Sequence, residues 1–238
     1  MSTPGRTVLK CDLFGVVSRV APEQPAPDPC VERDTTAAAP WVRWLARRLA
    51  AREARALAHL RGLPGVPRLV AWDGRRLLRS WLPGVPLHRA ASVDARWFRD
   101  ALRLLRRLHA LGLVHNDLAK EPNWLVDADG GAGLLDFQLA LRPRMRGRLF
   151  RALAYDDLRH LLKHKRTYCP ERLTARQRRI LARRSLLAAA WARTVKPAYR
   201  LVTRGLLGWA DREGAGDRGA AQGSTVSKSS AGASPGRK

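Results

Sequence analysis

The stretch LVHNDLAKEPNWLV at residues 113–126 and the stretch LLDFQLA at residues 134–140 together decide how this chain is interpreted. His115, Asp117 and Asn123 lie within nine residues between apolar runs, and Asp136 follows thirteen residues after Asn123. The first stretch alone is compatible with an ordinary polar turn between a helix and a hairpin, or with a site for phosphate transfer.

Phosphoryl transfer needs few protein groups, and these two stretches contain three of them. One carboxylate must orient or deprotonate the attacking hydroxyl, while a second carboxylate and an amide oxygen hold Mg²⁺ on the phosphates. Asp117 follows a predicted helix, Asn123 begins a predicted strand, and Asp136 ends the next strand. An Asp-Gly-Gly turn between these strands would bring Asp136 back beside Asn123. His115 is suited to bracing the loop through hydrogen bonds.

The order of predicted elements divides the chain into two lobes. Short β-prone runs, a long helix opened by Pro40 and an Asp-Gly hairpin signal at 73–74 indicate a β-rich lobe over residues 1–83. Residues 84–210 are mostly helical. We therefore expect an α+β bilobal fold with a ligand cleft between the lobes. A tail over residues 211–238, rich in Gly, Ser and Ala, has too little apolar surface to order itself.

Three local patterns refine the predicted helices. The long helix after Pro40 carries apolar residues near one face, which we expect to pack inward with arginines on the other face; these are Trp41, Leu45, Leu49 and Leu57. Ser92 is the predicted N-cap of the helix that precedes the central loop. A T-x-x-Q capping box at 174–177 predicts a further helix from Leu173.

Composition limits the possible partners without choosing one. The formal net charge is +25, and only seven of the 45 basic residues are lysine. This charge attracts polyanions such as nucleic acid, anionic lipid or phosphorylated substrates, although arginines spread over solvated helix faces would give the same total.

No apolar run of about 18 residues is present, so a membrane-spanning helix is not expected. The N-terminus lacks a signal-peptide pattern, and three unpaired, widely spaced cysteines favour a reducing cytoplasm.

The central stretches resemble the protein-kinase-like superfamily. H-x-D…N followed by D-F is the pattern of the catalytic loop and the metal-binding segment. The string HNDLAKEPNW…DFQLA is similar to small bacterial RIO-like serine/threonine kinases and, more loosely, to lipopolysaccharide core (Kdo) kinases and aminoglycoside-type phosphotransferases. The resemblance implies a bilobal kinase fold, ATP and Mg²⁺ as cofactors, Asp117 as catalytic base, and Asn123 and Asp136 as metal ligands.

Upstream and downstream segments extend the resemblance over roughly residues 8–165. Arg33 precedes Glu53 by twenty residues, close to the separation between the basic strand residue and the helix glutamate that pair in this superfamily. By itself, Glu53 would be interpreted as part of a surface pair with a neighbouring arginine. Phe14 and Gly15 resemble the end of a glycine-rich phosphate loop. Asp157 in DDLRHLL resembles the aspartate that supports the catalytic loop from beneath.

Four departures from the superfamily pattern stand out. The loop from Asp117 to Asn123 carries one extra residue, which would displace Lys120 from the position of the usual catalytic-loop lysine. Arg33 replaces the usual strand lysine, and a guanidinium is larger and planar. The phosphate loop lacks its first two glycines, and Lys10, at the first of these positions, is an alternative phosphate contact.

The fourth departure is that DFG has become Asp136-Phe137-Gln138, and no long activation loop follows. Asn116 stands where an arginine would pair with a phosphorylated loop.

The resemblance implies an ATP- and Mg²⁺-dependent phosphotransferase, foremost a cytoplasmic protein serine/threonine kinase. A second interpretation is a kinase for a sugar hydroxyl of the lipopolysaccharide core, with VKPAYRLVTRGLLGW at 195–209 lying on the inner membrane face. The third is a catalytically inactive kinase-shaped module that binds RNA or anionic lipid through its arginines.

Overall fold

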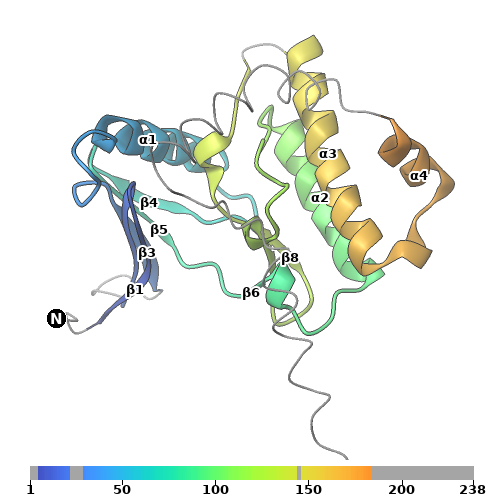
Figure 1. The fold of residues 1–238 in the computed structure, drawn as a ribbon, viewed down its shortest axis with the longest axis horizontal. Helices are drawn as coiled ribbons and strands as arrows, with labels where there is room; N and C mark the ends of the chain where they lie inside the picture. Colours follow the sequence, from blue (N-terminus) through green and yellow to red (C-terminus); the bar gives the residue numbers. More distant parts are fainter. Residues whose placement is uncertain (1–4, 22–28, 144–145, 184–238) are drawn as a thin grey trace, which may run out of the picture.

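The fold is described from a computed structural model of the chain, over residues 5–21, 29–143 and 146–183. Figure 1 shows two lobes, with a twisted sheet beside a helix on the left and further helices packed together on the right. Two segments predicted from the sequence, 195–209 and the tail 211–238, lie outside the described residues.

The N-lobe is a five-stranded antiparallel sheet with one helix against it, in the strand order β1-β2-β3-β5-β4. Its elements are β1 (Arg6–Asp12), β2 (Gly15–Val20), β3 (Cys30–Asp34), α1 (Arg43–His59), β4 (Leu69–Trp72) and β5 (Arg76–Ser80). The predicted Asp-Gly hairpin joins β4 and β5, where Asp73 Oδ1 accepts hydrogen bonds from the backbone N–H groups of Arg75 and Arg76. Gly74 takes the positive φ that such a turn requires.

The buried face of α1 differs from the predicted one. The residues of α1 that contact the lobe are mostly small, namely Ala46, Ala50, Glu53, Ala54, Ala56 and Leu57. Trp41, which was predicted to pack inward, is 58% exposed, and Trp44 is 65% exposed. The prediction for Trp41 is wrong because α1 begins only at Arg43, after Trp41, and small alanines form the face that packs closely on the sheet.

The C-lobe consists of helices and a small sheet of order β6-β7-β8. Its elements are β6 (Val85–Pro86), η1 (Leu87–Arg89), α2 (Ala95–Ala110), η2 (Glu121–Asn123), β7 (Trp124–Val126), β8 (Ala132–Leu134), η3 (Phe137–Leu139), α3 (Arg148–Tyr168), η4 (Pro170–Arg172) and α4 (Ala175–Ala182). The main core joins the end of α1 to α2, the central loop and α3, and includes the fully buried Trp97, Trp124 and Phe137.

The helix caps test two local predictions. The N-cap of α2 is Asp94, whose side chain accepts from the backbone N–H of Trp97, so the prediction of Ser92 is wrong by two residues. Ser and Asp can both cap a helix, but only the Asp94 carboxylate lies three residues before the N–H that donates to it. The capping box of α4 is confirmed, with Thr174 and Gln177 each bonded to the other's backbone N–H.

The α+β bilobal architecture predicted from the sequence is confirmed. Among the described helices, none is both long enough and apolar enough to cross a bilayer.

Candidate active site

The loop between α2 and β7 brings Asp117, Lys120 and Asn123 together. The Asn123 amide donates from Nδ2 to the backbone carbonyl of Asp117 at 2.8 Å and to its Oδ2 at 3.1 Å. Lys120 Nζ lies 3.2 Å from the same Oδ2. The side chain of Asp117 is 14% exposed, whereas that of Lys120 is 47% exposed. The carboxylate is thus held in a fixed orientation and partly shielded from water.

Asp136 is placed next to this loop by the β7–β8 hairpin. The pairing continues past the strand ends, because the backbone N–H of Leu135 donates to the carbonyl of Asn123 at 2.9 Å. Asp136 has φ of 59°, in the left-handed region that residues other than glycine rarely adopt. Its buried Oδ1 has no hydrogen-bond partner among the described residues. Strain together with an unpaired carboxylate oxygen is typical of a ligand site.

The charges around the two carboxylates shift their pKa values in opposite directions. Burial raises the pKa of Asp117, and the Asp136 carboxylate adds to this, while Lys120 opposes it. Burial also opposes ionisation of Asp136, but the cations Arg33 and Lys120 outweigh it, so the pKa of Asp136 lies below its ordinary value. Asp117 is therefore the more basic carboxylate, and Asp136 the more firmly ionised one.

Asp157 on α3 holds the start of the loop that contains Asp117. Its Oδ2 accepts from the backbone N–H of His115 at 2.8 Å and lies 3.1 Å from His109 Nε2, and its Oδ1 accepts from Asn116 N–H at 2.9 Å. Asn116 also has a positive φ, 62°. One buried carboxylate thus holds a strained backbone in place just before Asp117.

His115 braces the loop through a hydrogen bond, as its position suggested. Its Nε2 is 2.8 Å from the carbonyl oxygen of Leu135, so this nitrogen carries the proton and donates. The ring also lies against Phe137, with ring centroids 4.8 Å apart. His115 therefore joins the loop that contains Asp117 to the Asp136 segment.

The longer loop is held in place by Glu121, which is buried. Tyr168 donates its hydroxyl proton to Glu121 Oε2 at 2.9 Å, and His164 Nδ1 lies 3.7 Å from Oε1. His164 Nε2 also donates to the carbonyl of Leu118 at 2.8 Å. The loop with the extra residue is thus fastened to the end of α3, between Asp117 and Asn123.

Arg33 and Glu53 meet inside the N-lobe, together with a second arginine that the sequence analysis did not single out. Glu53 has no exposed surface. Arg33 Nε lies 3.5 Å from its Oε2, and Arg79 Nε lies 3.3 Å from its Oε1. Complete burial raises the pKa of Glu53, and the two guanidinium groups oppose this rise. The interpretation of Glu53 as a surface pair is thereby excluded.

Gln138, in the place of the DFG glycine, contacts Arg33. Its side-chain amide satisfies its neighbours when the oxygen faces Arg33, accepting from Nε at 3.0 Å and from Nη2 at 2.9 Å. The same segment also contacts α1, since Arg52 Nε donates to the carbonyl of Ala140 at 3.1 Å. The Asp136 segment is therefore fixed to both β3 and α1.

The region predicted as a phosphate loop is a tight hairpin turn. Only Leu13 and Phe14 separate β1 from β2, and the Phe14 N–H donates to Asp12 Oδ1. Gly15 has φ of 119°, and a Cβ on it would lie 2.1 Å from the carbonyl oxygen of Asp34. Gly15 is thus required for the close approach of this turn to β3, and a role of Phe14 and Gly15 at the phosphates stays a prediction.

Lys10 pairs with its neighbour Asp12 at 2.6 Å and remains 59% exposed. It lies opposite Val17, and Val17 lies opposite Arg33. Directly paired residues point to the same face of a sheet. Lys10 and Arg33 therefore share one face, on strands roughly 10 Å apart given the usual spacing between neighbouring strands.

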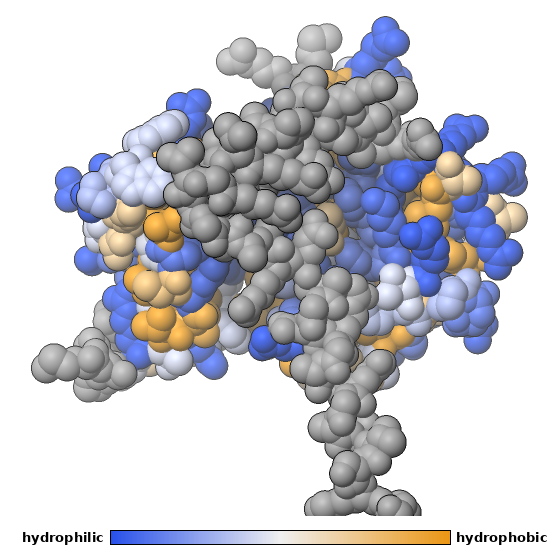
Figure 2. All heavy atoms as spheres, viewed as in Figure 1, coloured by the Kyte–Doolittle hydropathy of each residue, from blue (hydrophilic) through white to orange (hydrophobic). Residues whose placement is uncertain are grey.

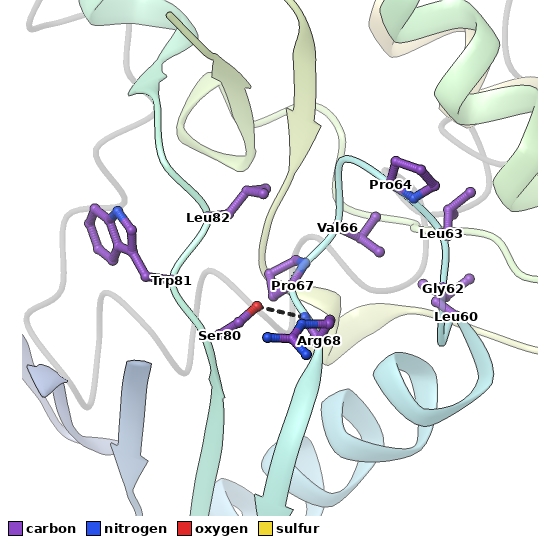
Figure 3. A pocket seen from close by; sticks show the side chains of 10 residues that line it. All are labelled: Leu60, Gly62, Leu63, Pro64, Val66, Pro67, Arg68, Ser80, Trp81 and Leu82. Carbon is purple, nitrogen blue, oxygen red and sulfur yellow. Dashed lines mark hydrogen bonds between the residues drawn. The ribbon is translucent and has the colours of Figure 1, made fainter. Parts of the chain in front are cut away.

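A cavity of about 300 Å³ lies away from these residues, between the end of α1, the connection to β4 and the chain after β5. Figure 3 shows Val66, Pro67 and Leu82 around it, while Trp81 points away from them; the Arg19 guanidinium lies 4.6 Å from the centre of the Trp81 ring. None of the predicted site residues lines this cavity.

The residues at the centre fit a magnesium ion bound mainly through a nucleotide. Mg²⁺ prefers oxygen ligands and is commonly held by one or two protein groups plus phosphates and water. Asp136 supplies an unpaired oxygen. The Asn123 Nδ2 donates to Asp117, so the amide oxygen of Asn123 is left to bind the metal ion. Among the described residues no cluster of three or more His, Cys, Asp or Glu side chains could hold a metal without such help.

Comparisons with known proteins support the fold. The structure matches the crystal structure of the Rio2 kinase from Chaetomium thermophilum with a TM-score of 0.52 and 18% identity, covering 78% of this chain and 67% of that one. It also matches the Rio2 kinase–ADP/Mg²⁺–phosphoaspartate complex from the same organism, with a TM-score of 0.53 and 18% identity over 84% of this chain and 68% of that one. No protein-family model matches the sequence, and neither does any curated protein. The chain thus has a protein-kinase-like fold of the RIO type.

Proposed function

We propose that the protein is an ATP- and Mg²⁺-dependent phosphotransferase that transfers the γ-phosphate of ATP to a hydroxyl group, with a serine or threonine side chain of a protein as the favoured acceptor. The observation that carries the proposal is the junction of Asp117, Asn123 and Asp136, made by the Asn123 amide and the continued β7–β8 pairing. The kinase-like fold supports it.

Each residue has a definable part in the reaction. Asp117 accepts the proton of the acceptor hydroxyl while the hydroxyl oxygen forms the new bond to the γ-phosphorus. At the same time the bond between this phosphorus and the β–γ bridging oxygen breaks. ADP leaves with the bridging oxygen. The raised pKa of Asp117 favours this proton transfer. Asp136 and Asn123 would hold Mg²⁺, which neutralises phosphate charge when bound.

Cations on the N-lobe would bind the phosphates. Arg33 lies beside Asp136 and is oriented by Glu53 and Gln138. Lys10 shares its face of the sheet. We assign the main phosphate contact to Arg33, since its partners fix its guanidinium, and a secondary contact to Lys10. Lys120, at the Asp117 carboxylate, would neutralise charge on the transferred phosphoryl group.

Two alternatives to a protein kinase are compatible with the fold. A sugar hydroxyl of a lipopolysaccharide core is the alternative acceptor, and a cytoplasmic location, with contact at the inner membrane face, suits either acceptor. An inactive module that binds RNA or anionic lipid is the alternative from another class. The Rio2 complex contains a phosphoaspartate, and the unpaired Oδ1 of Asp136 would make this residue the candidate for such an adduct here.

One labelling experiment separates these possibilities. Purified protein is incubated with γ-labelled ATP and Mg²⁺ in the presence of a generic protein substrate or of lipid A–Kdo. Stable label on the protein substrate supports the favoured acceptor, and label confined to the glycolipid contradicts it. Label on the enzyme that hydroxylamine removes identifies an acyl phosphate. Absence of any Mg²⁺-dependent turnover would identify the inactive module.

A further inference from the structure

The exposed end of the N-lobe carries a surface that the catalytic proposal does not use. It is formed by the β1–β2 turn and the outward face of α1, and we refer to it as the N-lobe tip; it comprises Leu13, Trp41, Trp44, Arg48 and Arg55. All five side chains are exposed. The backbone N–H of Ala39 donates to the carbonyl of Leu13 at 3.1 Å, which fastens the turn to the segment that leads into α1.

The α1 residues of the N-lobe tip form one continuous stripe. At about 100° per residue, Trp44, Arg48 and Arg55 fall within an arc of roughly 40°, and Trp41 lies in the turn just before α1. The stripe is about 16 Å long from Trp44 to Arg55 at the usual helical rise of about 1.5 Å per residue. It lies away from the alanine face that packs on the sheet. The stripe is therefore a single accessible strip with indoles at its start and guanidinium groups further along.

The charge of this surface is of one sign. The only acidic residue of α1 is Glu53, which is fully buried between two arginines. Two nearby carboxylates are engaged elsewhere, since Asp12 pairs with Lys10 and Asp34 accepts hydrogen bonds from Thr36. The N-lobe tip thus presents positive charge to an approaching surface, with no exposed acidic side chain of α1 beside it.

The apolar side chains around the N-lobe tip distinguish between polyanions. Leu13, in the β1–β2 turn, is 36% exposed, and its carbonyl is bonded to the segment that leads into α1. Figure 2 shows apolar side chains gathered over the strands of the N-lobe. Indole rings can stack on nucleic-acid bases, but aliphatic side chains gain little there. In a bilayer, the aliphatic groups enter the hydrocarbon boundary, the indoles lie at the headgroup level, and arginines meet anionic headgroups.

From this complementarity we infer that the N-lobe tip docks the protein on the surface of an anionic phospholipid bilayer. The contact is peripheral, made by Trp41 and Trp44 in the headgroup region with Arg48 and Arg55 on the lipid phosphates. This inference goes beyond the proposed phosphotransfer and uses none of its residues, so either can fail without the other.

Vesicle binding by the full chain tests the inference. The protein is sedimented with vesicles of phosphatidylcholine alone, and with vesicles in which part of the lipid is phosphatidylglycerol. We expect binding to the anionic vesicles only. Trp41→Ala/Trp44→Ala should weaken it about tenfold or more, since two large apolar surfaces no longer leave water. Arg48→Gln/Arg55→Gln should weaken it about fivefold for each arginine removed.

Matched variants control for general charge and hydrophobicity. Arg106→Gln/Arg107→Gln removes two exposed arginines from α2, and Leu149→Ala removes an exposed apolar side chain from α3; both should bind as the unaltered protein does. Thermal unfolding shows that each variant is folded. Equal losses in the α1 and α2 arginine variants, or an unchanged Trp41/Trp44 variant, would overturn the inference. RNA binding that the tip variants lose while vesicle binding persists would assign the surface to nucleic acid instead.

Discussion

Arg79 Nε lies 3.3 Å from Glu53 Oε1, inside the N-lobe, at a position that no kinase motif marks. Glu53 therefore has two cationic partners, and Arg33, its other partner, can bind phosphate without leaving the buried carboxylate uncompensated. Burial lowers the pKa of Arg79, and Glu53 opposes this decrease; an arginine in such a pair remains protonated. If Arg33 binds phosphate as proposed, Arg79 would act as its positioning residue.

Replacing Arg79 by methionine should destabilise the fold. Loss of one partner from a buried ion pair typically costs about 3–5 kcal/mol of unfolding free energy. The variant should also show a raised KM for ATP, because Arg33 becomes the sole partner of Glu53 and is held away from the phosphates. Denaturant unfolding and steady-state kinetics measure the two effects.

Arg55→Met, on the exposed side of α1, is the matched control for Arg79→Met and should change stability by less than about 0.5 kcal/mol. An Arg79→Met variant as stable as the control would show that Arg33 alone compensates Glu53.

The rate of phosphotransfer should fall on the acidic side as Asp117 becomes protonated. The base must be ionised, so activity rises with pH through the pKa of Asp117, which burial has raised above that of an ordinary aspartate. Lys120→Met removes the cation that lowers this pKa, and should therefore move the acidic limb to higher pH. Profiles of kcat/KM against pH for the two proteins measure the shift. An acidic limb at the same pH in both proteins would indicate that a group other than Asp117 controls it.

The loop with the extra residue should depend on Tyr168. Its hydroxyl donates to the buried carboxylate of Glu121, and a hydrogen bond to a charged group contributes about 1.5–3 kcal/mol. Tyr168→Phe should lower the unfolding free energy by about this amount and reduce kcat, since the loop positions Asp117. Tyr155→Phe, whose hydroxyl is 3.4 Å from a backbone carbonyl on α4, is the control and should have the smaller effect. Equal effects in both variants would contradict this role.

Two glycine substitutions separate backbone strain from collision. Gly15→Ala and Gly74→Ala both place a Cβ on a residue with positive φ, and each should cost more than about 1 kcal/mol. Only at Gly15 does the new Cβ meet the Asp34 carbonyl, whereas nothing lies within 4 Å at Gly74. Gly15→Ala should therefore be clearly the more destabilised in thermal unfolding. Similar losses would mean that the β1–β2 turn moves away from β3.

Much of the site could be predicted because its parts are close in sequence. The spacing from His115 to Asn123 and the Asp-Gly-Gly turn before Asp136 are local features, and the hairpin that joins them follows from turn chemistry. Glu53 required a remote argument, its separation from Arg33. The kinase-like fold expected from these patterns is confirmed.

The parts that escaped prediction depend on tertiary packing. Arg79 follows the buried Leu77 by two residues on β5, so the two side chains share a face of the strand and the spacing was a signal that Arg79 points inward. Its partner Glu53 lies on another element, and the sequence did not reveal it. Trp41 was misplaced because hydrophobicity was taken as the guide to the buried face of α1, whereas close packing selected alanines. The buried Glu121 could not be distinguished from a solvated charge in a loop.

The central claim is that this chain catalyses phosphate transfer from ATP with Asp117 as the base. The most direct measurement is Mg²⁺-dependent formation of ADP by the unaltered protein and by Asp117→Asn, with ATP binding measured in parallel by calorimetry. We expect turnover in the unaltered protein, ATP binding in both, and a loss of turnover in the variant of about 10²-fold or more. Equal rates in the two proteins, or no turnover in either despite ATP binding, would contradict it.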